Sequence, residues 1–523
     1  MAIVEAVLAL IAVCIGFALI AQRSRLPYSV VLVVGGMAIA FIPGMPQIEL
    51  DPHIALAFFL PPLLQASAYR TDWQGFRDNL RPILLLAVGA VLFTTICIAF
   101  VARLLIPDLP WAAAIALGAI VAPPDAVAAG SILQRLRLPR RLVTVLEGES
   151  LINDASALVV YRFAVAAMVT AFSPWEAVGA LVLVAGGGVL IGWAMGRAAI
   201  WLLPRLRDTL LETAASFVLC FAAFLAAEAV HASGVMAVVT AGIMLGRASH
   251  TALSARTRQE ARVVWDFLEF ILNSLVFILI GLQLNAILGR LDAYTPLTLI
   301  GLAAVLSVVL IVSRFLWIAP VVWLPRLIPQ IRRRDPLPPF SHIIVMSWAG
   351  MRGVVSLAAA LALPIGFPAR DLLIFLAFCA ILATLVVQGT TLEWVIRRLG
   401  VEEKRSARMG WEEAAARTLV AQASLARLVA HADDPLDGAI AQDILPEYRD
   451  NVRLLDGIGQ GAVAAERTAR LQLRLEALQH GRARLLRHHA EDGLDEELLQ
   501  RIGQELDLEE LRLRRLLGAS EEF

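Results

Sequence analysis

Four carboxylates lie close together in the sequence within a strongly apolar stretch, namely Asp125, Glu147, Glu149 and Asp154. A charged side chain at the centre of a bilayer costs at least about 2.5–3.5 kcal/mol, so such a cluster needs a reason. Carboxylates bind hard cations through oxygen, and they also take up and release protons. No histidine or cysteine lies near the cluster, which argues against a transition-metal site.

The spacing places several oxygen-bearing side chains on one side of a predicted helix. Glu149 and Asn153 are four residues apart and share a face, and Ser150 and Asp154 share the adjoining face. Oxygen ligands stacked one turn apart suit a small hard cation that has lost part of its water. The alternative is that these polar side chains only hold neighbouring helices together.

Two prolines interrupt the preceding apolar segment just before Asp125. Pro123 and Pro124 have no amide donors, so a helix cannot run through them unbroken. Carbonyls that lose their partners at this depth must face protein or a wet cavity. A simple proline kink is the alternative, but it leaves the adjacent carboxylate unexplained.

A single arginine, Arg352, lies between Gly350 and Gly353 in a second apolar segment. The glycines allow the backbone to unwind or to be approached closely there. A lone arginine within a membrane must be paired, and the surplus carboxylates of residues 142–170 are the available partners. Arg162 and Arg314 also lie inside apolar segments and are assigned no role.

The composition indicates that membrane-spanning helices position these residues. The 523 residues are 59% hydrophobic and 17% charged, with a mean hydropathy of +0.73, which excludes disordered chains, collagen and small disulfide scaffolds. We predict an all-α polytopic membrane protein with thirteen transmembrane helices of about 20 residues each. The predicted spans are 2–21, 27–43, 53–68, 83–106, 111–134, 142–170, 175–203, 210–230, 234–247, 263–289, 297–325, 341–364 and 371–396.

Arginine predicts the orientation of these spans. The odd-numbered connections hold 21 arginines and the even-numbered connections hold three. Loops that stay in the cytoplasm are enriched in Lys and Arg, so we expect the N-terminus outside and the C-terminus in the cytoplasm, in the cell (inner) membrane. Glu5 stands where a signal peptide would be basic, which favours a retained first span.

The two halves of the membrane region correspond to each other. If span 175–203 links two groups of six, span 111–134 corresponds to span 341–364, and the two run in opposite directions. Both are interrupted, and corresponding broken helices in inverted repeats point to a transporter site near the membrane midplane. Three glycines at four-residue spacing predict close helix packing within the subunit: Gly188, Gly192 and Gly196.

The chain changes character near residue 400. Up to Leu399 there are 28 basic and 21 acidic residues, and from Gly400 onward there are 17 and 24, which gives +7 and −7. We therefore expect a transmembrane domain over 1–400 and a cytoplasmic tail over 401–523. Leucines at three- and four-residue spacing predict amphipathic helices in the tail, with a regulatory role and an unidentified ligand.

Three motifs resemble the monovalent cation:proton antiporter-1 family, which includes prokaryotic sodium/proton antiporters and animal sodium/proton exchangers. They are PPDAVAA (Pro123–Ala129), EGESLINDASALVVYRFA (Glu147–Ala164) and WAGMRGVVSLAAALALP (Trp348–Pro364). The resemblance covers the thirteen spans, about 400 residues. It implies a dimerisation domain and a core with two crossed, unwound helices, and we expect a homodimer.

The resemblance also implies roles for individual residues. Asp154 would bind the cation and the proton alternately, and Asp125 and Ser150 would help to coordinate a transient Na⁺. Asn153 would complete the asparagine–aspartate pair of electroneutral members. Glu149 would be held by Arg352 in a structural ion pair.

One position departs from the family's commoner pattern. Pro124-Asp125-Ala126 stands where Thr-Asp-Pro is usual, so a threonine hydroxyl ligand is lost. A backbone carbonyl, as at Pro124, or a water must then substitute for it. The departure leaves the preference between sodium and potassium open.

We therefore expect a secondary antiporter that exchanges Na⁺, with K⁺ or Li⁺ as alternatives, for H⁺ without net charge movement, by alternating access. It would not be an enzyme, and no cofactor or nucleic acid is implied; its partners are monovalent cations, protons and membrane lipid. A potassium-selective efflux antiporter with a sensing tail is the nearest alternative. A cation channel is a further alternative, because channels also use carboxylates. An intramembrane hydrolase is another, because Asp125 and Asp154 could imitate an aspartyl dyad.

Overall fold

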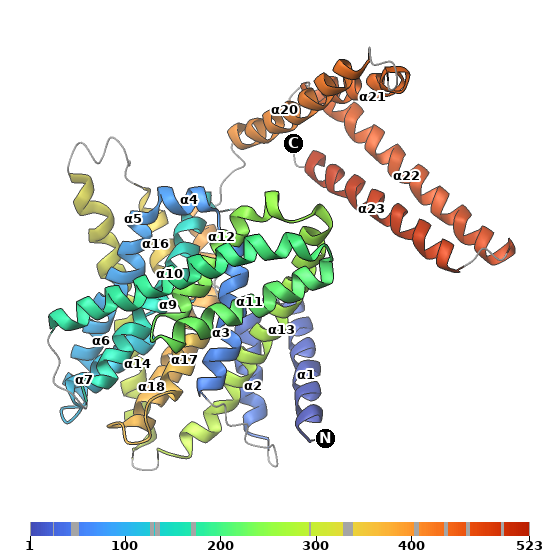
Figure 1. Ribbon diagram of the computed structural model, residues 1–523. Helices are drawn as coiled ribbons and strands as arrows, with labels where there is room; N and C mark the ends of the chain where they lie inside the picture. The colour runs from blue at the N-terminus through green and yellow to red at the C-terminus, as the bar shows by residue number, and fades with distance from the viewer. Residues whose placement is uncertain are drawn as a thin grey trace. The chain divides into compact units, whose positions relative to one another are not determined.

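The computed structural model describes residues 2–24, 26–42, 52–125, 130, 136, 138–168, 174–291, 294–327, 338–401, 407–432, 438–456, 461–492 and 496–521. Within these residues all regular structure is helical (Figure 1). Contacts divide the chain into two compact units, Met1–Glu402 and Glu403–Phe523. Part of the fifth predicted span, including the Ala126–Ala129 end of its motif, lies outside the described residues.

The first unit contains the long apolar helices. In chain order its elements are α1 (Ala2–Ser24), α2 (Tyr28–Ala40), α3 (Pro52–Arg70), α4 (Trp73–Asp78), α5 (Leu80–Leu84), the π-helical turn η1 (Leu85–Ala90), α6 (Val91–Leu105), α7 (Trp111–Val121), α9 (Arg140–Ala166), α10 (Pro174–Leu206), α11 (Thr209–Ala229), α12 (Gly234–Ala252), α13 (Ala255–Leu288), α14 (Pro296–Trp323), the 3-10 turn η2 (Leu324–Leu327), α16 (Phe340–Trp348), α17 (Val354–Leu361), α18 (Arg370–Ala383), the π-helical turn η3 (Thr384–Gln388) and α19 (Gly389–Leu399).

Twelve of the thirteen predicted segments coincide with one helix or with one interrupted helix, and the described part of the segment 111–134 begins with α7. Of the described helices, six are individually long and apolar enough to cross a membrane, and these are Leu80–Leu105, Val182–Leu206, Thr209–Ala229, Ala255–Leu288, Pro296–Trp323 and Arg370–Leu399. The interrupted pieces α7, α16 and α17 have 11, 9 and 8 residues, too few to cross alone. The number thirteen and the repeat relationship stay predictions.

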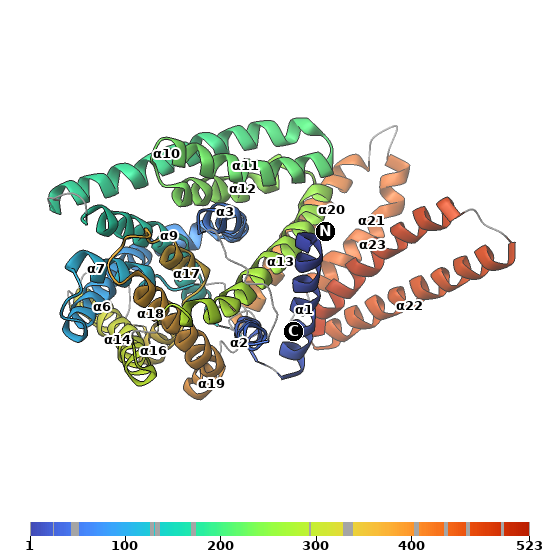
Figure 2. The same ribbon diagram turned by 90° about the horizontal axis from the view of Figure 1, so that it is seen from below.

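The first unit has two groups of helices with the interrupted segments between them. Figure 2 shows α10, α11 and α12 along one side, α6, α14 and α18 on the other, and α3, α9 and α17 between. α12 packs on both α10 and α3, while α7 packs on both α6 and α9. The glycines of α10 explain its close approach to α12, because a Cβ on Gly192 would lie 2.3 Å from the Ala237 carbonyl oxygen. Packing of this glycine face within the subunit is confirmed.

Local sequence explains where several of these helices begin and end. Asp208 caps α11 by accepting from the Leu211 amide, and Ser233 caps α12 by accepting from the Met236 amide. α19 ends at Gly400, whose φ of +60° is the left-handed conformation that glycine adopts without a Cβ penalty. The change in composition at residue 400 therefore coincides with a helix stop.

The second unit consists of amphipathic helices, as the leucine spacing predicts. They are α20 (Ala407–His431), α21 (Gly438–Asp456), α22 (Gly461–Asp492) and α23 (Glu496–Glu521). α20 packs on α21, and α22 packs on α23. Ion pairs join α21 to α22, among them Arg470–Asp450 at 2.9 Å and Arg474–Glu447 at 2.9 Å.

Candidate cation-binding site

Two helix interruptions meet inside the first unit. α7 ends at Val121 because Pro123 and Pro124 cannot donate amide hydrogen bonds, and residues 122–125 are non-helical. The second interruption separates α16 from α17 at residues 349–353. The Asp125 amide donates to the Met351 carbonyl at 2.7 Å, so the two irregular segments contact each other directly. Both interruptions predicted from proline and glycine are present.

Arg352 stabilises the contact between the two irregular segments by donating hydrogen bonds to backbone carbonyls. Its Nε donates to the Val121 carbonyl at 2.6 Å, at the carboxyl end of α7, and Nη1 donates to the Gly350 carbonyl. Its amide donates to the Thr384 hydroxyl at 3.1 Å in η3. A broken helix leaves carbonyls without partners and a negative dipole end, and the buried guanidinium compensates for both.

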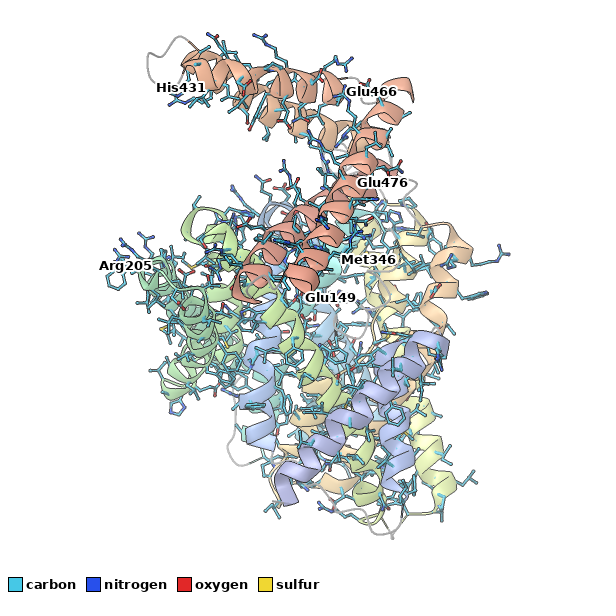
Figure 3. All side chains as sticks on the ribbon, turned by 90° about the vertical axis from the view of Figure 1, so that its right-hand side faces the viewer. Glu149, Arg205, Met346, His431, Glu466 and Glu476 are labelled. Atoms are coloured by element: carbon cyan, nitrogen blue, oxygen red, sulfur yellow. The ribbon has the colours of Figure 1, made fainter. Side chains whose placement is uncertain are left out.

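The predicted ion pair between Glu149 and Arg352 is wrong, because Arg314 of α14 is the partner of Glu149. Arg314 Nη1 and Nη2 donate to the two Glu149 carboxylate oxygens at 2.6 and 2.8 Å, and both residues are buried. Arg314 Nε also donates to the Met346 carbonyl at 3.1 Å, and Figure 3 labels Glu149 and Met346. The fork of Arg314 fits both carboxylate oxygens, whereas that of Arg352 is used by carbonyls.

The helix that carries the predicted cluster, α9, is held by two further hydrogen bonds, one to the interruption at residues 122–125 and one to η1. Asn153 Nδ2 donates to the Pro124 carbonyl at 2.7 Å, and Ser156 Oγ donates to the Ala87 carbonyl in η1 at 2.6 Å. The Pro124 carbonyl thus keeps one lone pair for another donor or a cation. Asn153 therefore holds the backbone beside Asp125 in place.

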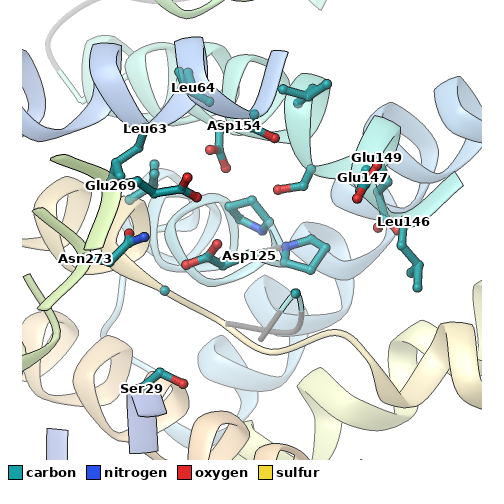
Figure 4. Close-up of a pocket in the computed structure, with 18 of the residues that line it drawn as sticks. Ser29, Leu63, Leu64, Asp125, Leu146, Glu147, Glu149, Asp154, Glu269 and Asn273 are labelled. Carbon is teal, nitrogen blue, oxygen red and sulfur yellow. The ribbon is translucent and has the colours of Figure 1, made fainter. Parts of the chain in front are cut away.

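A cavity of about 690 Å³ lies at the meeting point and contains the predicted carboxylates. Figure 4 shows Asp125 and Asp154 facing the same space, with Glu269 and Asn273 on one side and Glu147 and Glu149 on the other. Ser150, Pro123 and Pro124 also line it, as do residues of α3 and α13. The structure therefore brings together Asp125, Ser150, Asp154 and Pro124, which the sequence indicates as one site.

The charges around the cavity are unequally paired. Arg70 pairs with Asp266 at 3.2 Å and with Glu269 at 2.6 Å, and Arg314 pairs with Glu149. Asp154 is only 8% exposed and forms no hydrogen bond or ion pair with the residues that the structure describes. Burying a carboxylate without a charged partner is costly, and a bound proton or cation would reduce that cost.

Asp125 is positioned by a close approach that only glycine permits. A Cβ built on Gly353 would lie 1.6 Å from Asp125 Oδ2. The φ of Gly353 is −140°, outside the left-handed region, so the absence of a side chain, and not a positive φ, is what this position requires.

Sequence reasoning missed the contribution of α13 to the cavity wall. Asp266, Glu269 and Asn273 all line the cavity. Their spacing of three, four and seven residues places them on one helical face, a signal that the sequence does contain. Arg314 likewise lies inside an apolar segment, but its partner cannot be identified from spacing within its own helix.

A second cavity, of about 560 Å³, lies toward the other end of α9. Leu60 of α3 lines both cavities, and it packs in one apolar cluster with Leu151 and Ala155 of α9. Arg162 lines the second cavity and pairs with Glu228 of α11 at 2.9 Å. An apolar layer that includes Leu60, Leu151 and Ala155 therefore lies between the second cavity and the cavity that Asp154 lines.

A family profile described as "Sodium/hydrogen exchanger, transmembrane" matches residues 7–398. The chain belongs to the transmembrane sodium/hydrogen exchanger family. An uncharacterised Na⁺/H⁺ exchanger of Mycobacterium tuberculosis is 32% identical over 97% of this chain and 95% of that protein. Membership and the apolar helices together indicate a multi-pass membrane antiporter.

Two further similarities bear on the exchanger. A sodium, potassium, lithium and rubidium/H⁺ antiporter of Bacillus pumilus is 33% identical over 70% of this chain and 57% of that protein. The solved sodium proton antiporter MjNhaP1 from Methanocaldococcus jannaschii is 19% identical, with a TM-score of 0.60, covering 76% of this chain and 99% of that one. The structural similarity establishes a shared fold, and the relatives are named as transporters rather than enzymes.

Proposed function

We propose that this exchanger moves Na⁺ outward and H⁺ inward, and that Asp154 carries the two alternately. The observation that carries the proposal is that Asp154 is buried at a cavity, beside the crossing of two interrupted helices, without a protein cation to neutralise it. A bound cation and a bound proton each neutralise the same carboxylate, so they compete. Competition for one group couples their movements.

Asp125, Ser150 and the Pro124 carbonyl supply the other ligands for the transported cation. Pro124 contributes a backbone oxygen that is already oriented by Asn153 at 2.7 Å. Glu149 does not bind the ion, because Arg314 occupies both its carboxylate oxygens. Glu149, Asn153 and Arg352 thus maintain the shape of the site.

Alternating access follows from the two cavities and the apolar layer between them. Movement of α9 and the interrupted segments relative to Leu60 of α3 would open Asp154 to one cavity and close it to the other. A channel would instead need a continuous wet path. We propose that this movement takes place in a protein of thirteen spans in inverted repeats, with the N-terminus outside, the tail in the cytoplasm of the inner membrane, and a homodimeric assembly.

The exchange is electroneutral in this proposal, one proton for one cation. Asn153 stands beside Asp154 where a second titrating carboxylate would bring a second proton. Moving one unbalanced charge would couple the cycle to membrane potential by about 2.3 kcal/mol per 100 mV. With Na⁺ gradients in proteoliposomes clamped by K⁺ and valinomycin, imposed potentials should leave the reversal point unchanged. A reversal point that moves with voltage would show that a second charge is carried.

The substrate is Na⁺, with Li⁺ and K⁺ as weaker alternatives, and the physiological role is pH homeostasis. The Bacillus pumilus relative is named for four cations, so its name does not favour a potassium-only exchanger. Proton flux from proteoliposomes should be measured against NaCl, KCl and LiCl in turn. Saturable flux with Na⁺ supports the proposal, and flux with K⁺ alone would favour the potassium-efflux alternative.

A further inference from the structure

A third cavity, smaller than the two described above, lies away from Asp154. It is enclosed by α3, α10, α11, α12 and α13. Its volume is about 50 Å³, enough for a small ion with one or two waters. Its polar lining includes residues from three helices, which are Gln65 of α3, Glu212, Thr213 and Ser216 of α11, and Thr257 and Trp265 of α13. The exchange mechanism uses none of these side chains.

Glu212 is the unexplained group in this cavity. It is 6% exposed, and its Oε2 is buried without any hydrogen-bond partner. None of the ion pairs among the described residues includes it. A buried carboxylate oxygen without a partner loses its hydration and gains nothing in return, so a missing occupant is the direct explanation.

Three further side chains of the lining, Gln65, Thr213 and Ser216, offer acceptor atoms as well. Gln65 is 4% exposed, and its Oε1 is also buried without a partner. The Thr213 and Ser216 hydroxyls donate their only hydrogens to the Thr209 and Thr213 carbonyls, each at 2.7 Å. Ser216 Oγ also accepts from Trp265 Nε1 at 3.2 Å, which leaves it one lone pair. A hydroxyl that has donated its hydrogen offers only lone pairs to a further partner. The unpartnered oxygens of Glu212 and Gln65 therefore favour a cation or a hydrogen-bond donor as the occupant.

The arginines on the wall do not replace such a cation. Arg70 lies between Asp266 and Glu269, which together neutralise it. Arg262 is exposed, so water screens its charge. Glu212 is left as the buried negative charge that an occupant would neutralise.

We propose that this cavity is a second cation site, in which Glu212 holds one alkali cation with help from Gln65, Thr213 and Ser216. Oxygen ligands of this kind suit hard ions, and a single carboxylate matches a monovalent rather than a divalent charge. The site is separate from the exchange site, but the two cavities share Arg70, Arg262 and Asp266 in their walls. Ion occupancy beside Glu212 can therefore alter the shared wall of the exchange cavity.

The test uses the full-length protein carrying Asp154→Asn, which removes the carboxylate of the exchange site. The unfolding temperature and ²²Na⁺ binding are measured against NaCl or KCl, with choline chloride holding the ionic strength constant. We expect saturable stabilisation and one bound ion per chain. Adding Glu212→Gln should remove both, since an amide has no net charge to attract the ion. Adding Thr213→Val instead should weaken binding about tenfold or more.

Glu260→Gln is the matched control, because it removes a nearby carboxylate that is exposed and paired with Arg256. It should leave the cation response of the Asp154→Asn protein unchanged. The proposal would be overturned if the cation response persisted after Glu212→Gln is added, or if the Asp154→Asn protein itself showed no response. A response to Ca²⁺ or Mg²⁺ alone would also overturn it. If the Glu212→Gln protein does not fold, the Thr213→Val titration decides. Exchange by Asp154→Asn would contradict the proposed function separately, without affecting the Glu212 comparison.

Discussion

Arg314 holds both carboxylate oxygens of Glu149, at 2.6 and 2.8 Å, in the interior of the helical unit. The pair neutralises one of the carboxylates around the cavity and leaves Asp154 as the buried one without a protein partner. It also connects α9 to α14 and, through the Met346 carbonyl, to α16.

Arg314→Gln should destabilise the protein by about 3–5 kcal/mol, because it leaves Glu149 charged and unpaired in a buried site. The unfolding temperature in detergent measures this. Adding Glu149→Gln should recover part of the loss, since no isolated charge then remains. Arg256→Gln, which removes an exposed pairing partner of Glu260, is the control and should change little. An Arg314→Gln protein as stable as wild type would show that the pair is unimportant.

Arg352→Gln should abolish transport and lower stability for a different reason. The Val121 carbonyl at the end of α7 would lose its charged donor, and the crossing of the interrupted segments would loosen. Glu149→Gln should therefore not rescue Arg352→Gln. Rescue in a thermal-shift and flux comparison would mean that Arg352 acts through Glu149 after all.

These two arginines also show what sequence can and cannot provide here. Helix positions and both interruptions follow from local chemistry, namely apolar runs, Pro123 and Pro124, and the glycines around Arg352. The partner of Glu149 depends instead on which helix packs against α9 at its depth, and no spacing within one helix contains that information. The sequence predicts a carboxylate partner for Arg352, although a broken helix supplies carbonyls that serve equally well.

Gly353→Ala should weaken cation binding, because its Cβ would lie 1.6 Å from Asp125 Oδ2 and would displace that carboxylate. We expect the KM for Na⁺ to rise about tenfold or more, from loss of a charged ligand contact. Gly366→Ala is a matched control, since a Cβ there meets nothing within 4 Å. Equal KM values for the two variants in a sodium-dependent flux assay would contradict the positioning of Asp125 by Gly353.

The α21–α22 junction should be insensitive to pH across the neutral range. The hydrogen bond from Arg470 lowers the pKa of Asp450, with further lowering by its charge and that of Arg453. A carboxyl with a lowered pKa stabilises the fold above its unfolded pKa, and this is lost only as pH falls through the folded value. Neutral pH lies above both values.

Hydrogen exchange of α21 and α22 in the full-length protein checks this. Corrected for intrinsic rates, protection should be the same at about pH 6 and about pH 8. High salt should reduce it, because the ion pairs are exposed. A marked change with pH would assign pH sensing to this junction, contrary to the ion-pair arrangement.

The central claim, that Asp154 carries cation and proton alternately, is tested most directly by exchange in proteoliposomes that contain Asp154→Asn protein. A neutral amide of nearly the same shape neither takes up a proton nor neutralises a bare cation, so a sodium gradient should drive no proton movement. Size-exclusion behaviour and unfolding temperature should confirm that the variant is folded. Sodium-driven proton flux near the wild-type rate from such folded protein would contradict the account.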